Sequence, residues 1–186
     1  MRTLFIMLIV YGLFPLTAFS SSNSSSTNPS HFSNTLESKS LIVLVKRYRS
    51  GFPRKRPATG RRVFIFSPRL LRWAAYDANG RLVRTGRASG GRGYCRDIGR
   101  SWRTPRGVFR VKSKGSKYCR SSRYPRPRGG APMPYCTFFY GHYAIHGSPD
   151  VPNYNASHGC IRVKPHAAAW LSGFLRIGTT VIVRPY

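Results

Sequence analysis

The apolar residues of this chain fall into short runs, and their spacing is what most constrains the fold. Runs rich in β-branched and aromatic side chains alternate with segments rich in Gly, Pro, Ser and Asn. Such short runs are typical of strands rather than helices. Asp77-Ala78-Asn79-Gly80 indicates a tight hairpin turn, because Asn-Gly tolerates the positive φ that this turn needs. We predict strands over residues 62–67, 70–76, 81–88, 107–111, 137–145 and 180–183.

One segment indicates a helix instead. Residues 165–171 contain three consecutive alanines and begin with Pro165, which is favoured at the first helical position. Residues 112–132 are rich in Ser, Arg, Pro and Gly and predict a loop. The predicted class is therefore mostly β, with one or two short helices.

The N-terminal third differs in composition from the rest. Residues 1–20 resemble a secretory signal, with an early Arg2, an apolar run and small residues at Ala18 and Ser20. We expect cleavage after Ser20; an uncleaved membrane anchor is the alternative, although the run is short of the roughly 20 residues that a spanning helix needs. Residues 21–60 are Ser-rich and then basic, and we interpret them as a tether. Residues 61–186 remain as the folded domain of an exported protein, located in the periplasm or cell wall.

The charge is strongly unbalanced. The chain has 32 basic and 4 acidic residues, which gives a net charge of +28. A field of this sign concentrates anions. For an exported chain we expect anionic cell-envelope polymers as partners, no specific nucleic acid, and membrane contact only through an uncleaved signal. A secreted polyanion-binding protein is thus one alternative function, whereas a glycan-cleaving enzyme is disfavoured because it generally needs a pair of carboxyl groups.

The chain has four cysteines, and an oxidising compartment would permit disulfides among them. If Cys160 is a reactive thiol, three cysteines remain and one of those stays unpaired within the chain. Cys95–Cys119 is the preferred bridge, and Cys119–Cys136 is nearly as favourable.

Residues 146–162 carry the pattern that indicates chemistry. Cys160 has His158 two residues before it and Arg162 two residues after it, and His146 ends a predicted strand. An imidazole can accept the proton of a thiol, and a positive surround favours the thiolate. Gly159 would allow close substrate approach and leave consecutive N–H groups free for an oxyanion. The alternatives are an inert buried thiol, or a zinc site made of His142, His146, His158 and Cys160, whose spacing matches no common zinc pattern.

The segment Ser157-His158-Gly159-Cys160-Ile161-Arg162, preceded by Ala144-Ile145-His146-Gly147, closely resembles the signature of the L,D-transpeptidase catalytic domain family of YkuD type. The resemblance extends to the Thr-Pro-x-Gly strand entry at residues 104–109, to residues 133–135 and to the ending at 178–183. It covers about residues 61–186. The short loop after His146 and the Arg-rich segment 92–132 depart from the family pattern, so substrate preference transfers least.

The resemblance implies a small β-barrel or sandwich with the cysteine at the mouth of a cleft, and no cofactor or metal. It implies acyl transfer through a Cys160 thioester: attack on the third residue of a peptidoglycan tetrapeptide stem releases D-alanine, and a neighbouring stem amine completes the cross-link. With water as acceptor the same site would be an L,D-carboxypeptidase, and with a protein lysine it would anchor envelope proteins. The implied roles are nucleophile for Cys160, base for His146, orientation of the base and binding of the oxyanion for Gly147, His158 and Gly159, and substrate binding for Ser157, Arg162 and Tyr135.

Overall fold

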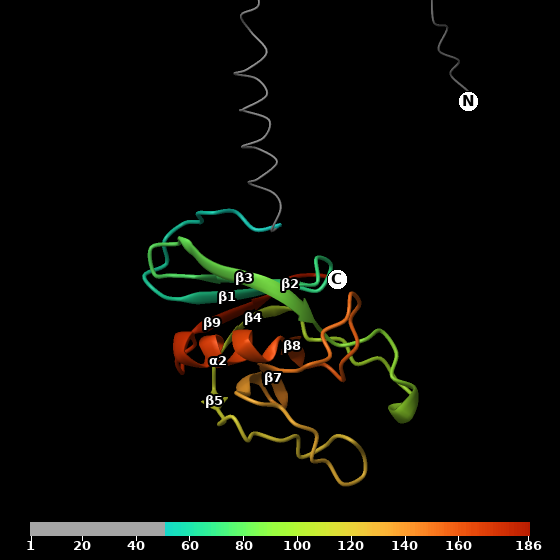
Figure 1. Cartoon of the computed structure of the whole chain (residues 1–186). Coiled ribbons are helices and arrows are strands. Elements are labelled where there is room, and N and C mark those ends of the chain that lie inside the picture. Colours follow the sequence, from blue (N-terminus) through green and yellow to red (C-terminus); the bar gives the residue numbers. More distant parts are fainter. Residues whose placement is uncertain (1–50) are drawn as a thin grey trace, which may run out of the picture.

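The computed structural model describes residues 51–186 (Figure 1). The predicted signal segment and most of the predicted tether lie outside the described residues. The elements, in chain order, are β1 (Val63–Ser67), β2 (Arg72–Tyr76), β3 (Leu82–Ser89), the 3-10 helix η1 (Arg96–Ile98), β4 (Gly107–Arg110), β5 (Ser113–Lys114), β6 (Thr137–Tyr140), β7 (Tyr143–Gly147), β8 (Ile161–Val163), α2 (Pro165–Phe174) and β9 (Thr180–Val183). None of the helices between residues 51 and 186 has the length and apolarity needed to cross a membrane.

All described strands join one sheet in the order β4-β9-β1-β2-β3-β8-β7-β6-β5. Strand β3 connects the two halves of this sheet, because its residues Leu82 to Arg87 pair with β2, whereas Ala88 and Ser89 pair with β8. The sheet curls so far that Phe109 on β4 and Phe139 on β6, near its opposite edges, have ring centroids 5.5 Å apart. The result is a half-barrel, which confirms the expected mostly-β class.

Helix α2 fills the curl of the sheet. Its buried Leu171 and Phe174 belong to the main core, together with residues of β1, β2, β7, β8 and β9. Trp170 stacks on Trp73 of β2 at 6.2 Å. Figure 1 shows α2 between β1–β3 on one side and β7 on the other. Each fully buried large apolar side chain stabilises the folded state by about 1.5–3 kcal/mol. The buried side chains of α2 therefore hold the sheet curled around the helix, and this curvature positions β7 and β8.

Strand β1 is buried on both faces. Phe64 faces the main core, whereas Val63 and Ile65 pack with Phe52 in a second cluster. The segment around Phe52 is held by backbone hydrogen bonds, including one of 2.9 Å from Arg56 N–H to the Gly80 carbonyl. Residues 52–56, placed in the tether by the sequence analysis, therefore pack on the folded domain in the structure.

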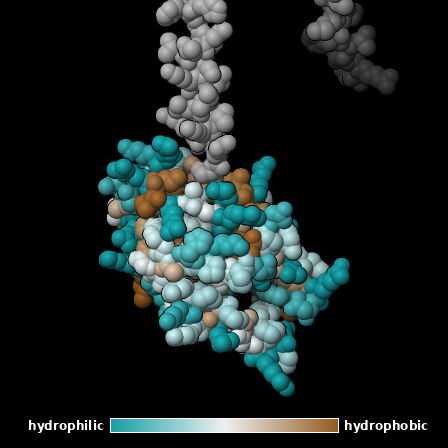
Figure 2. All heavy atoms as spheres, in the orientation of Figure 1, coloured by the Kyte–Doolittle hydropathy of each residue, from teal (hydrophilic) through white to brown (hydrophobic). Residues whose placement is uncertain are grey.

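The surface seen in Figure 2 is largely hydrophilic, as the high content of Arg and Lys predicts.

The remaining differences concern short elements. The single strand predicted over 137–145 is a hairpin, in which β6 and β7 are joined at Gly141 with φ 47°. The sequence analysis missed β5, β8 and η1. These are two or three residues long, and such short segments have no periodicity to detect. The turn at Asn79-Gly80 and the helix beginning at Pro165 were predicted correctly.

Candidate active site

A cavity of about 380 Å³ opens beside the ends of β7 and β8. It is lined by residues of several segments that are separate in the sequence, among them Trp102, Arg120, Arg123, Tyr124, Met133, Tyr143, His146, Ser157, His158, Cys160 and Arg162. The fold thus brings His146, Ser157, His158, Cys160 and Arg162 to one hollow, together with residues that the sequence did not indicate.

Strand pairing places His146 and Cys160 at this hollow. Strands β7 and β8 are parallel, with Ile145 opposite Ile161 and His146 opposite Arg162. Cys160 lies directly before β8, and His146 is the penultimate residue of β7. Two side chains fourteen positions apart in the sequence therefore line the same cavity.

His146 is buried and held by its own neighbour. Its Nδ1 atom lies 2.8 Å from the Gly147 carbonyl oxygen, so Nδ1 donates its proton there when the ring is neutral. Burial is the main reason that the pKa of His146 falls to about 4; the Gly147 hydrogen bond opposes this shift, and the nearby Arg162 charge adds to it. At neutral pH the ring is consequently uncharged, with Nε2 available to accept a proton.

Cys160 is a free cysteine whose thiol is also uncharged at rest. Its Sγ atom donates a long hydrogen bond of 3.7 Å to the His142 carbonyl. Burial raises the pKa of the Cys160 thiol, and a hydrogen bond with the Ala144 backbone and the charge of Arg162 only partly counteract this. The sequence analysis expected the positive surround to favour the thiolate; in the structure, desolvation outweighs that charge.

The turn before Cys160 is fixed by local hydrogen bonds. Gly159 adopts φ 108°, and a Cβ atom there would lie 2.4 Å from Tyr143 and 2.7 Å from Trp102. Its N–H donates to the Ser157 hydroxyl at 3.0 Å, and its carbonyl accepts from Thr104 Oγ1 at 2.8 Å. The absence of a side chain at Gly159 thus makes room for the side chains of Tyr143 and Trp102. The sequence analysis expected the Gly159 N–H to be free for an oxyanion, but in the structure it is engaged within the turn.

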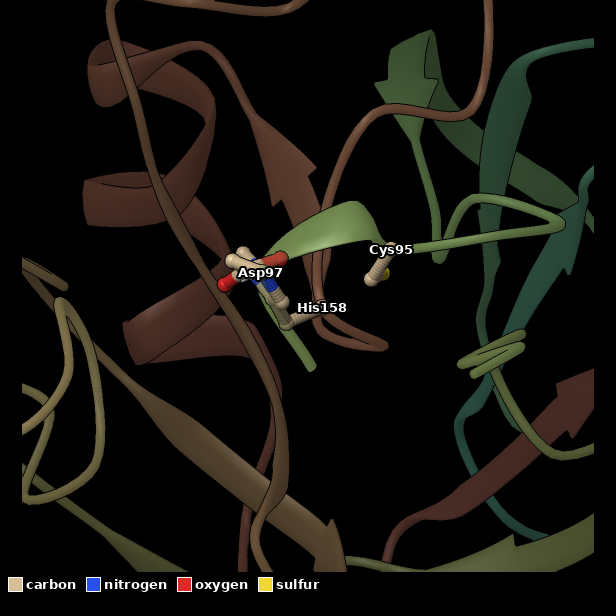
Figure 3. A group of neighbouring side chains, drawn as sticks. All are labelled: Cys95, Asp97 and His158. Carbon is tan, nitrogen blue, oxygen red and sulfur yellow. Dashed lines mark hydrogen bonds and ion pairs between the residues drawn. The ribbon is translucent and has the colours of Figure 1, made fainter. Parts of the chain in front are cut away.

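His158 points to a different partner. Its Nε2 atom lies 2.7 Å from Asp97 Oδ2, and its ring stacks on Tyr124 with a centroid distance of 4.1 Å. Figure 3 shows the side chains of Asp97 and His158 in direct contact. The imidazole therefore links η1 and the 119–136 segment to the turn of residues 157–160.

The three residues expected to bind substrate have different surroundings. Arg162 lines the cavity and is ion-paired with Asp150 at 2.6 Å. The Ser157 hydroxyl is engaged, because it donates to the Cys160 carbonyl at 2.6 Å while accepting from Gly159. Tyr135 is not among the cavity-lining residues; it adopts φ 58° and packs against the main core, and its contact with substrate stays a prediction.

The sequence analysis missed the wall of the cavity formed by Trp102, Tyr124, Arg120 and Arg123. It treated the Arg-rich segment 92–132 only as a departure from the family pattern, whereas the fold brings two of its arginines to the cavity. The signal that could have found part of this wall was the pair Cys119 and Cys136, which flank Arg120, Arg123 and Tyr124. Cys119 and Cys136 form a disulfide with a Cα–Cα distance of 6.1 Å. The preferred pairing of Cys95 with Cys119 is wrong, because Cys119 is bonded to Cys136 and Cys95 is a free, buried thiol at the start of η1.

The alternative zinc site of His142, His146, His158 and Cys160 does not form as a group. Among residues 51–186, Cys95, Asp97 and His158 are the one set of three potential metal ligands that converge. Only His158 belongs to both sets.

Comparisons with known proteins agree with this geometry. The model of the L,D-transpeptidase catalytic domain (YkuD) matches residues 60–183. No curated protein matches the chain. Among solved structures, it resembles the L,D-transpeptidase (residues 123–326) from Xylanimonas cellulosilytica at 31% identity and TM-score 0.61, with 78% of this chain and 69% of that chain covered.

Two further structures are complexes, one with imipenem and one with a faropenem-derived adduct. LD transpeptidase LdtMt1 in complex with imipenem is 25% identical, with TM-score 0.56 and coverage of 66% of this chain and 58% of that chain. L,D-transpeptidase 3 from Mycobacterium tuberculosis with a faropenem-derived adduct shares the fold at 23% identity and TM-score 0.56, with 67% and 60% covered. The chain spans less than two thirds of these two structures. The matched model covers most of the present chain, which therefore belongs to the L,D-transpeptidase catalytic domain (YkuD) family.

Proposed function

We propose that this protein is an exported peptidoglycan L,D-transpeptidase that cross-links third-position stem residues through a Cys160 thioester. The observation that carries the proposal is the hydrogen bond between His146 Nδ1 and the Gly147 carbonyl. It leaves Nε2 as the basic atom of a neutral imidazole that lines the same cavity as the free Cys160 thiol. No carboxylate is needed to orient this base, and Asp150, the nearest in sequence, is paired with Arg162.

In the first half-reaction, His146 Nε2 accepts the Cys160 proton as Sγ attacks the carbonyl carbon of the third stem residue. Because both groups rest uncharged, this proton transfer accompanies the attack. The C–N bond to the terminal D-alanine then breaks, and the His146 imidazolium returns the proton to the leaving amine. A Cys160 thioester and free D-alanine result.

In the second half-reaction, an amine attacks the thioester carbonyl. His146 accepts the amine proton and gives it to the departing Cys160 sulfur, which restores the thiol. Both tetrahedral intermediates carry an oxyanion, and such charge is stabilised by preorganised N–H donors. Since the Gly159 N–H is engaged, we assign this role to the backbone N–H groups of His158 and Cys160.

The charge of the cavity fits an acidic peptide. Arg120, Arg123 and Arg162 line it, and Asp150 is the one carboxylate among its lining residues. Arginine is well suited to carboxylate recognition, because its planar fork can donate two parallel hydrogen bonds. Stem peptides carry free carboxylates, and the aromatic wall of Trp102 and Tyr124 provides apolar contact for their aliphatic parts.

The test is incubation of the purified protein with a disaccharide-tetrapeptide, followed by mass spectrometry. The proposal predicts release of D-alanine together with a cross-linked dimer, and neither product with Cys160→Ala. A hydrolysed tripeptide without dimer would identify water as the acceptor and contradict the transpeptidase assignment. Absence of both products would favour the alternative of a polyanion-binding protein with an inactive site. The observation that supports this alternative is the net charge of +28.

A further inference from the structure

We infer that Cys95, Asp97 and His158 form a binding site for a zinc-like divalent cation. The site lies at the turn of residues 157–160 and does not include the Cys160 thiol. The ligand atoms of the three residues all lie within 4.8 Å of one another. Figure 3 shows Asp97 of the short helix η1 beside His158, and Cys95 at the start of that helix. The site does not depend on the proposed catalysis.

The three side chains supply the ligand set that zinc prefers. Zinc is bound by thiolate sulfur, imidazole nitrogen and carboxylate oxygen at about 2.0–2.3 Å in tetrahedral geometry. Ligand atoms around such an ion lie roughly 3.3–3.6 Å apart. Asp97 Oδ2 and His158 Nε2, now 2.7 Å apart, would have to separate slightly to admit the ion, and the thiol would have to approach. Asp97 can move, because its side chain is half exposed.

The backbone holds the ligands in place before any ion binds. The turn carrying Cys95 and Asp97 is closed by a hydrogen bond of 2.9 Å from Cys95 N–H to the Arg100 carbonyl, and one of 3.3 Å from Ile98 N–H to the Cys95 carbonyl. The third ligand, His158, lies between Ser157 and Gly159, which are joined by a hydrogen bond within the turn of residues 157–160. Its ring is also stacked on Tyr124. Ordering the site would therefore cost little conformational entropy.

The depth of the ligands gives an entry path. Cys95 is fully buried, His158 is partly exposed and Asp97 is half exposed. An ion would meet the carboxylate first and the sulfur last. Three protein ligands leave a fourth position, which water can fill from the exposed Asp97 side.

Charge and ligand type decide between cations. Thiolate and carboxylate together neutralise one divalent ion, and binding would release the Cys95 proton. Calcium and magnesium take at least six oxygen ligands, whereas this site offers a single carboxylate. The nearby Arg92 further disfavours an ion held by charge alone. The site thus fits a borderline-soft ion bound by sulfur and nitrogen.

The convergence is notable because carboxylates are scarce: the chain has four acidic residues. One of them reaches a histidine 61 positions away in the sequence, beside a cysteine that the disulfide leaves free. An ion there would link η1 to the turn that carries Cys160, and so brace the active-site loop.

The experiment uses Co²⁺ as a spectroscopic probe on the full chain carrying Cys160→Ser, without reductant so that the Cys119–Cys136 disulfide stays intact. In that background Cys95 is the one free thiol. We expect one Co²⁺ per chain with thiolate-to-metal charge-transfer absorption, and displacement by Zn²⁺. Cys95→Ala should abolish the absorption, and Asp97→Asn should weaken binding at least about tenfold.

Asp150→Asn is the matched control, since Asp150 is an exposed carboxylate that is paired with Arg162 and is not one of the three converging ligands; it should leave binding unchanged. Circular dichroism checks that each variant is folded, and the exposed Asp97→Asn change remains informative if the buried Cys95 variant is not. The inference is overturned if no charge-transfer band appears, if the band survives Cys95→Ala, or if Asp150→Asn weakens binding as much as Asp97→Asn.

Discussion

His146 Nδ1 lies 2.8 Å from the carbonyl oxygen of the next residue, Gly147, so the strand itself orients the imidazole. A triad carboxylate usually has this task. The arrangement allows a base in a chain with only four acidic residues, and it predicts that the base function depends on burial and backbone geometry.

The first prediction follows from that burial. His146→Gln should lower turnover about 10²–10⁴-fold, the usual contribution of general-base assistance. The pKa of His146 is about 4 in the folded protein and 6.5 when the ring is exposed. Between these values the unfolded state binds more protons, so stability rises with pH in this window and is lost as pH falls through it.

Urea unfolding at pH 7 and pH 5 measures this effect. When the pH is lowered from 7 to 5, the free energy of unfolding of the parent should fall by about 2 kcal/mol more than that of His146→Gln. His166→Gln is the control, because His166 is exposed on α2 and its change should leave the parent's pH dependence intact. Equal pH dependence in the parent and His146→Gln would show that His146 is not buried as a neutral ring.

The second prediction concerns Gly159. Gly159→Ala should lower the free energy of unfolding by about 2 kcal/mol or more, because the new Cβ meets Tyr143 and Trp102 at a positive φ. Turnover should fall as well, since the turn positions Cys160. Gly173→Ala, on α2 where no atom lies within 4 Å of the new Cβ, should instead stabilise by up to about 1 kcal/mol. Chemical denaturation of both variants decides, and a neutral Gly159→Ala would contradict the packing described.

The structure of the site was only partly predictable from the sequence. His146, Gly147 and Cys160 were singled out because they lie in the two pieces of one recognisable signature, whereas their meeting in space depends on the pairing of β7 with β8. Trp102 and Tyr124 were missed because they reach the cavity through tertiary packing of irregular segments. Asp97 was missed because only the fold brings it to His158. Gly159 was identified for the wrong reason: the sequence shows that a glycine is there, but not that Tyr143 and Trp102 fill the space beside it.

The fold followed the same rule. Strands with long β-branched and aromatic runs, such as β1, were predicted within one residue. The hairpin of β6 and β7 was read as one strand, because aromatic residues continue on both sides of Gly141. Which strands pair in parallel, and therefore that β7 and β8 meet, depends on the sheet as a whole.

The third prediction concerns the disulfide. Replacing Cys119 and Cys136 together by alanine should lower stability by roughly 3 kcal/mol in the chain-entropy model. Because the closed segment carries Arg120, Arg123 and Tyr124, the Michaelis constant for a tetrapeptide should rise. Peptide mapping without reduction checks the pairing, and Cys95→Ala should leave the 119–136 bridge in place. A bridge from Cys95 to Cys119 would refute it.

The fourth prediction concerns the basic segment before β1. Arg54, Lys55 and Arg61 are exposed, whereas Arg62 lies over the Phe174 ring and donates to its carbonyl. Neutralising the three exposed residues should weaken binding to isolated cell wall, because fewer counterions are released. Turnover on a soluble tetrapeptide should stay near the parent value, since charges more than about 8 Å apart are largely screened at physiological salt. Equal loss of both properties would place this segment in the active site.

The most direct test of the account is formation of a covalent acyl-enzyme at Cys160. The protein would be mixed with imipenem, a β-lactam bound by the related LdtMt1, and its intact mass and tryptic peptides measured. The parent and Cys95→Ala should each gain one adduct on the peptide that contains Cys160, whereas Cys160→Ala should gain none. His146→Gln should form the same adduct much more slowly. An adduct that persists in Cys160→Ala, or one that maps to Cys95, would contradict the assignment of Cys160 as the nucleophile.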